Sequence, residues 1–232
     1  MERIILIETS TALCSTALVE NGAIISYRES SAPKAHASLT AVFIREMLSE
    51  CGLSLDDCDA ICVSKGPGSY TGLRVGVSTA KGLCFGSGKP LLAAGTLDTL
   101  AAQAACEDVP CRKEDLEFII PMIDARRMEV YTAVFTSEGR QLPETTPVIV
   151  SEESFAAYLE QGPCLFIGDG AGKCADVIKH PNAYFHQCHP KASSMLSPAL
   201  NAYKEKRFED VAYFEPFYLK EFVATVSKKK LF

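Results

Sequence analysis

The residue types that most resemble a chemical motif lie in residues 65–76, KGPGSYTGLRVG. A phosphate-binding P-loop requires Gly-x4-Gly-Lys-[Ser/Thr], and no glycine of this run has a Gly-Lys pair five residues further on. A serine nucleophile would need Gly-x-Ser-x-Gly, whereas Gly68 directly precedes Ser69. A metallopeptidase of the His-Glu-x-x-His type is excluded by the absence of that motif. These residues therefore predict structure and contact rather than catalysis.

The same run predicts a turn between a strand at 60–64 and a helix at 71–85, with Ser69 and Thr71 as capping residues. Gly72, Gly76 and Ala80 recur every fourth residue of that helix. Glycine inside a helix costs about 0.5–1 kcal/mol relative to alanine, so something must pack closely against this face. Two partners remain open: the protein's own sheet, or a helix of another protein. We take the second as the functional hypothesis.

Two acidic residues each end an apolar strand. Glu8 follows residues 4–7, and Asp124 follows residues 119–123 at a fixed offset of 116 residues. Each carboxylate could simply end a strand and cap a turn. The repeated pattern instead indicates a duplicated α/β structure, similar to the actin-like, ribonuclease H-like architecture with two mixed sheets flanked by helices. In ATP-using members of that superfamily, the two acids organise Mg²⁺ and phosphates, and Gly168-Asp169-Gly170 would lie in an adenosine loop.

The remaining predicted strands and helices fall into two lobes. Strands at 4–7, 14–20 and 23–27, a helix at 36–51, a strand at 91–94 and a helix at 97–105 complete the first lobe, at residues 1–106. Residues 107–213 form the second, with helices at 152–159, 173–178 and 192–206. Residues 214–232 are predicted to return to the first lobe.

Composition limits the class of protein. The 232 residues are 47% hydrophobic without an 18-residue apolar run, which predicts a globular chain in the cytoplasm with no contact with the membrane. A net charge of −6 argues against a large nucleic-acid surface of its own. The ten cysteines lack Cys-x-x-Cys spacing and are predicted to be free thiols. His186, Cys188 and His189 could offer metal ligands, but no second cluster in the sequence completes a site, so no metal is predicted.

With these pieces together, the chain resembles the bacterial tRNA threonylcarbamoyladenosine biosynthesis family called TsaB or YeaZ. The resemblance rests on residues 7–11, 65–82, 124–126, 168–171 and 216–220. The related catalytic subunit TsaD has a His-x3-His metal pair, whereas here His36 is followed by Thr40. The resemblance implies a non-catalytic scaffold that pairs with a TsaD-type subunit and a TsaE-type ATPase, forms a homodimer when alone, and meets tRNA mainly through the complex.

The family pairs through its first two helices, which correspond to residues 36–51 and 71–85. The interface residues implied by the resemblance are His36, Leu39, Phe43, Met47, Gly72, Arg74, Val75, Gly76, Thr79 and Ala80. The residues of a vestigial nucleotide cleft are Glu8, Thr9, Ser10, Asp124, Arg126, Gly168, Asp169 and Gly170. The family usually has aspartate at the position of Glu8, and the extra methylene favours a degenerate cleft. No cofactor is expected on the isolated chain, and ATP with a metal ion only in the complex.

Two other functions remain as alternatives. An actin-like phosphotransferase acting on a small molecule would use Glu8, Asp124 and the Gly168–Gly170 turn. A glycoprotease-like peptidase is the less favoured one, because the motifs for a metal or serine mechanism are missing.

Overall fold

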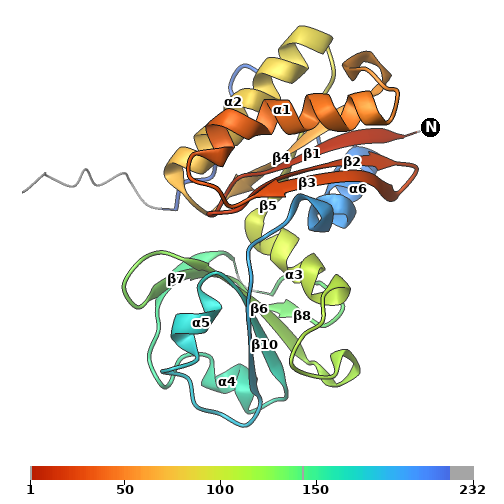
Figure 1. Cartoon of the computed structure of the whole chain (residues 1–232). Helices are drawn as coiled ribbons and strands as arrows, with labels where there is room; N and C mark the ends of the chain where they lie inside the picture. Colours follow the sequence, from red (N-terminus) through yellow and green to blue (C-terminus); the bar gives the residue numbers. More distant parts are fainter. Residues whose placement is uncertain (1, 143, 220–232) are drawn as a thin grey trace, which may run out of the picture.

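The computed structural model describes residues 2–142 and 144–219, which form two lobes, each built on a mixed sheet (Figure 1). The first sheet has the order β3-β2-β1-β4-β5. Its strands are β1 (Arg3–Glu8), β2 (Cys14–Glu20), β3 (Ala23–Ser30), β4 (Ala60–Gly66) and β5 (Leu91–Gly95). Asn21 and Gly22, both with positive φ, form the predicted tight turn between β2 and β3.

The second sheet repeats this topology, with the order β9-β7-β6-β10-β11 and β8 paired to β6. Its strands are β6 (Phe118–Asp124), β7 (Glu129–Thr132), β8 (Phe135–Thr136), β9 (Thr146–Ile149), β10 (Cys164–Gly168) and β11 (Ala183–Gln187). In both sheets the central strand is antiparallel to the next strand along the chain and begins a parallel set of three. The predicted duplicated α/β fold is therefore confirmed.

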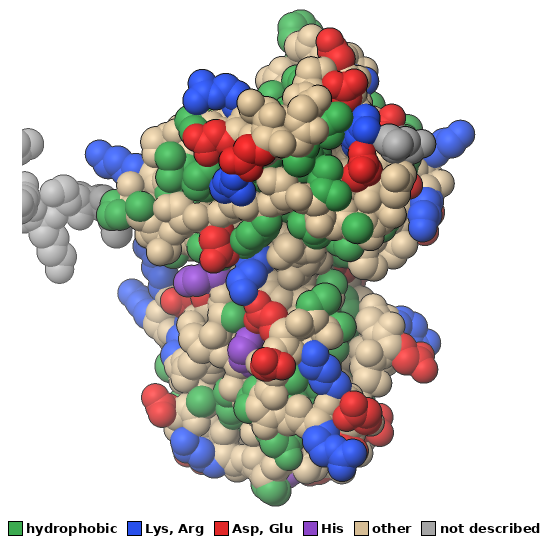
Figure 2. Space-filling view, turned by 45° about the vertical axis from the view of Figure 1, so that its right-hand side comes forward, with side chains coloured by type: hydrophobic (Ala, Val, Ile, Leu, Met, Phe, Trp, Pro, Cys, Tyr) green, Lys and Arg blue, Asp and Glu red, His purple; other side chains and the backbone are tan. Residues whose placement is uncertain are grey.

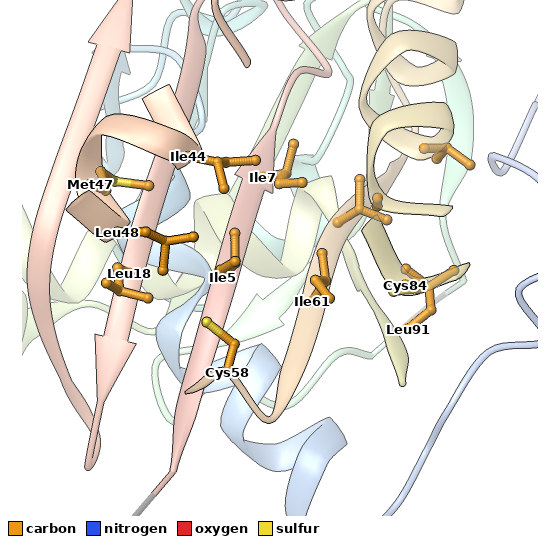
Figure 3. Packing of buried hydrophobic residues seen from close by; sticks show 13 residues of the cluster. Ile5, Ile7, Leu18, Ile44, Met47, Leu48, Cys58, Ile61, Cys84 and Leu91 are labelled. Atoms are coloured by element: carbon orange, nitrogen blue, oxygen red, sulfur yellow. The ribbon is translucent and has the colours of Figure 1, made fainter. Parts of the chain in front are cut away.

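Two long helices cover one face of the first sheet: α1 (Ala35–Glu50) and α2 (Tyr70–Ser87). Ile5, Ile7 and Ile61 point from the sheet toward the helix layer and pack in one cluster with Ile44 and Met47 of α1 (Figure 3). Gly52, with a φ of 66°, follows α1 as the predicted helix stop. A 3-10 turn, η1 (Leu55–Asp57), leads into β4.

The last helix of each lobe packs against the sheet of the other lobe. The helix α3 (Thr96–Cys106) contributes Leu97 and Leu100 to the core of the second lobe, beside Ile119. Conversely, η3 (Ala192–Met195) and α6 (Leu196–Lys204) cover the free face of the first sheet. Residues 192–204 fall within the predicted second lobe at 107–213, but they pack on the sheet of the first lobe.

The helices of the second lobe between its strands are short. They are α4 (Ala156–Leu159) and α5 (Ala171–Cys174), preceded by the 3-10 turn η2 (Lys113–Asp115). The predicted helices at 152–159 and 173–178 are thus only partly correct. Within the described part of the chain, no helix combines the length and apolarity needed to cross a bilayer.

The C-terminal segment 208–219 lies against the first lobe. The Glu209 N–H donates to the Leu91 carbonyl at 2.8 Å, and the Phe217 N–H donates to the Lys65 carbonyl at 2.7 Å. Residues 220–232, the rest of the segment predicted to return to the first lobe, lie outside the described part. All ten cysteines are free thiols, as predicted.

Candidate functional site

Helix α2 lies directly against the loop that joins β1 to β2. A Cβ atom added at Gly72 would lie 2.1 Å from the Thr9 carbonyl oxygen, and one at Gly76 would lie 2.2 Å from Thr9 Oγ1. At Gly68 the added atom would lie 2.4 Å from the Ser10 carbonyl oxygen. Because no side chain fits at these distances, the three glycines are required by packing within the chain itself.

This packing corrects the hypothesis that the small-residue face receives a partner. Gly72, Gly76 and Ala80 are buried on the inner face of α2. Met47, on the inner face of α1, has no exposed surface. The prediction that these four residues contact another protein is wrong. The alternative, that the bare face lies on the protein's own structure, is correct.

Ser69 fixes where α2 begins. Its Oγ accepts a hydrogen bond from the Gly72 N–H at 3.3 Å, as the predicted N-cap should. Its own N–H donates to the Ser10 carbonyl at 2.6 Å, so the cap and the β1–β2 loop hold each other in place.

Other predicted interface residues remain at the surface. Leu39 and Phe43 on α1 are half-buried, as are Val75 and Thr79 on α2. The two helices lie side by side on the outer face of the first lobe (Figure 1), so their exposed flanks form one continuous surface. We call the half-buried and exposed residues of these flanks the α1–α2 face.

Sequence reasoning missed three residues on the C-terminal half of α2. A Cβ atom added at Gly82 or Gly86 would have nothing within 4 Å in the part of the chain that the structure describes. Phe85 is 88% exposed between them. The two glycines are four residues apart, as are Gly72 and Gly76, but they are exposed, whereas the first pair is buried. Their spacing was the available signal.

His36 and Arg74 contact the chain itself. A ring nitrogen of His36, Nε2, lies 2.8 Å from the Thr11 carbonyl oxygen, which agrees with a polar contact at the start of α1. The Arg74 guanidinium lies 3.9 Å from the centre of the Tyr70 ring, and its Nε donates to Tyr218 Oη at 3.2 Å. Arg74 therefore helps to hold segment 208–219 against α2.

The first predicted acid of the cleft is sealed inside the protein. Glu8, Thr9 and Ser10 have no exposed surface. One oxygen of Glu8, Oε1, accepts a hydrogen bond from the Ser10 N–H at 2.6 Å, while Oε2 has no hydrogen-bond partner among the described residues. Burial raises the pKa of Glu8 to about 7.

The second acid is exposed but already paired. Asp124 forms an ion pair with Lys173, whose Nζ also donates to the carbonyls of Arg127 and Glu129 at 2.8 and 2.7 Å. The Arg126 N–H donates to Asp124 Oδ1 at 2.8 Å. Lys173 and the Arg126 N–H therefore contact the same carboxylate oxygen of Asp124, Oδ1.

The residues of the predicted adenosine loop contact the end of β6, the strand that carries Asp124. Asp169 Oδ1 accepts from the Asp124 N–H at 2.9 Å, and burial raises the pKa of Asp169. Gly168, with a φ of 131°, and Gly170 both lie against the Met122 carbonyl. The second half of the predicted cleft is therefore brought together around Asp124.

These residues do not fit Mg²⁺ and a nucleotide phosphate. Magnesium requires accessible oxygen ligands in nearly octahedral geometry, whereas Glu8 is enclosed and Asp124 is held by Lys173. Two cavities, of about 740 and 580 Å³, open between the lobes, and none of Glu8, Thr9, Ser10 and Asp124 lines either. Asp98 and Lys65 line both cavities instead.

The duplicated sheets and the two acid-ended central strands define an actin-like protein. The family model described as "TsaD: tRNA N6-adenosine threonylcarbamoyltransferase" matches residues 29–227. A solved structure of YeaZ from Pseudomonas aeruginosa superposes with a TM-score of 0.82 at 28% identity, covering 94% of this chain and all of that one.

Curated relatives point to one branch of that family. The tRNA threonylcarbamoyladenosine biosynthesis protein TsaB of Escherichia coli (strain K12) is 30% identical over 229 residues, covering 96% of each chain. Its counterpart from Bacillus subtilis (strain 168) is 28% identical, covering 94% of this chain and 93% of the relative. The chain therefore belongs to the TsaB (YeaZ) family, and the resemblance noted from the sequence is confirmed.

Proposed function

We propose that this protein is a scaffold subunit in the synthesis of tRNA threonylcarbamoyladenosine, and that it does not itself carry out the transfer. Its similarity to TsaB proteins over nearly the whole chain supports the pathway. The match to the TsaD family model supports a partner of TsaD type. A TsaE-type ATPase, homodimers of the isolated chain and work in the cytoplasm remain predictions of the family resemblance.

The sealed acid is the observation that carries the non-catalytic part of the proposal. In an active cleft the carboxylate must reach the metal and the phosphates, but Glu8 has no exposed surface, and the Ser10 N–H of the β1–β2 loop donates to its Oε1. The β1–β2 loop is in turn fixed in place, because Gly72 and Gly76 of α2 are fitted against Thr9 and Gly68 is fitted against Ser10. The lobe is thus built around a closed first acid.

The α1–α2 face is the surface that we assign to the TsaD-type partner. Gly82 and Gly86 each cost helix stability, about 0.5–1 kcal/mol, yet no atom of residues 2–142 or 144–219 would lie within 4 Å of a Cβ atom at either position. Phe85 exposes its ring beside them. Small residues let two helices approach closely, so a partner helix accounts for all three. With a net charge of −6, we expect this chain to leave most tRNA contacts to its partner.

Gly82→Leu tests this surface. A Cβ atom at this position has nothing within 4 Å among the described residues, so the monomer should keep its melting temperature, while association with the TsaD-type subunit should weaken at least tenfold. Size-exclusion chromatography and calorimetry of the co-purified pair measure the change. The matched control is Ala157→Leu on the exposed side of α4, which should leave binding intact. Wild-type affinity in Gly82→Leu would refute the assigned surface.

Calorimetry of the isolated chain with Mg-ATP separates the scaffold from the alternative phosphotransferase. The enclosed Glu8 and the Asp124–Lys173 ion pair predict no binding in the micromolar range. Micromolar binding with turnover would support the phosphotransferase and contradict the scaffold proposal.

A further inference from the structure

The two chain segments that cross between the lobes meet at one polar cluster. Helix α3 carries the chain into the second lobe, and the segment after β11 carries it back. Gln103, fully buried on α3, joins them: its Nε2 donates to the His189 carbonyl at 2.9 Å, and its Oε1 accepts from the Lys191 N–H at 3.0 Å. Figure 2 shows histidine side chains among acidic and basic groups at this waist between the lobes.

Three potential metal ligands converge beside Gln103. Glu107 directly follows α3, His186 lies on β11, and Cys188 begins the returning segment. One ligand atom from each lies within 4.8 Å of the others, and all three residues are half-buried. We propose that Glu107, His186 and Cys188 bind a zinc-like divalent cation that ties the two crossing segments together.

The distances require only a small adjustment. Zinc bound at about 2.0–2.3 Å in tetrahedral geometry separates its ligand atoms by about 3.3–3.8 Å. His186 Nε2 now lies 2.9 Å from Glu107 Oε2, so this pair must open by about half an ångström to admit the ion. Cys188 Sγ lies within 4.8 Å of the other two ligand atoms, so that a rotation of its side chain would bring it to the ion.

Residues around these three side chains already contact them, as residues around the ligands of a metal ion usually do. Lys191 Nζ contacts the other carboxylate oxygen, Glu107 Oε1, at 2.5 Å, which leaves Oε2 for the ion. Gln103 Nε2 lies 3.5 Å from Cys188 Sγ and can donate to a thiolate. Such contacts orient the ligands and tune the affinity of metal sites. The fourth position would take water.

The donor set selects the ion. A thiolate with an imidazole and a carboxylate favours zinc and its neighbours over magnesium or calcium, which prefer oxygen ligands. A bound ion would join the end of α3 to the returning segment and so restrict rotation of one lobe against the other. This role is independent of the proposed partner surface on α1 and α2.

Cobalt(II) titration of the full-length protein under reducing conditions tests the site directly. We expect one equivalent to produce a thiolate-to-cobalt charge-transfer band and the visible bands of tetrahedral cobalt, both abolished by excess zinc. Cys188→Ser should remove the charge-transfer band, and His186→Asn should weaken binding at least tenfold. Cys106→Ser, which removes an exposed thiol outside the cluster, is the matched control and should change nothing.

Thermal unfolding gives a second, independent measurement. Zinc at 100 times its Kd should raise the melting temperature of the wild type by about 5–10 °C, and that of Glu107→Gln by much less. Absence of any charge-transfer band in the wild type would overturn the proposal. So would a band that survives in Cys188→Ser. If Cys188→Ser does not fold, as judged by circular dichroism, the same decision rests on His186→Asn and Glu107→Gln.

Discussion

Glu8 shows how one acidic residue can keep its place in a fold without access to solvent. It ends β1 where a cleft acid would lie, but it has no exposed surface, and the Ser10 N–H of the β1–β2 loop donates to its carboxylate. Enclosure disfavours the charged form. With its pKa raised to about 7, the carboxyl group is partly neutral near physiological pH. The residue therefore behaves as part of the core.

Glu8→Gln should make stability less dependent on pH. The folded state keeps a proton that the unfolded chain loses near pH 4.5 and that the folded chain loses near about 7. Wild-type stability should therefore fall as the pH rises between these values. Above pH 7 the variant should be more stable, by at most about 3 kcal/mol, and near pH 4 the two should be equal.

Urea unfolding from pH 4 to 8 measures this difference. Glu46→Gln, on the exposed side of α1, controls for loss of a surface charge and should reproduce the wild-type profile. Parallel wild-type and Glu8→Gln profiles would show that the carboxyl group ionises without cost, in conflict with its enclosure.

At the scale of elements, α2 carries two glycine pairs with opposite roles. Gly72 and Gly76 face the Thr9 backbone and side chain, whereas Gly82 and Gly86 face open space. The sequence predicted the helix, its cap at Ser69 and a close contact at the first pair. It could not show which partner made that contact, because spacing along one helix carries no information about what lies opposite.

Alanine substitutions should separate the two faces. Gly72→Ala places a Cβ atom 2.1 Å from a backbone carbonyl, so it should lower the free energy of unfolding by about 1–3 kcal/mol or more. Gly82→Ala places one in open space and should raise it by up to about 1 kcal/mol. Denaturant unfolding of both variants checks the signs. Equal effects would mean that the two faces are not distinguished by packing.

For the whole molecule, the two lobes are held together by exchanged helices. The order of elements along the first lobe and their repetition in the second were predicted from apolar runs, the Asn21-Gly22 turn and the repeat at Asp124. The exchange of helices between the lobes could not be predicted, because the apolar periodicity of these helices fits either sheet. Glu107 illustrates the same limit for the candidate metal site: it lies 79 residues from His186 in sequence, and only the fold brings the two together.

The first lobe alone should therefore not be stable. In a fragment of residues 1–106, the face of the first sheet formed by Ile4, Leu6 and Leu92 would lose its cover of η3 and α6, and α3 would lose the second sheet. Exposed apolar surface of this extent favours association. We expect the fragment to bind a hydrophobic dye, to elute as aggregates and to lack a cooperative melt. Co-expression with residues 107–232 should restore a discrete complex, because that piece supplies both missing surfaces. A monomeric fragment with a sharp melting transition would instead show that each lobe folds independently and that the exchanged helices only dock afterwards.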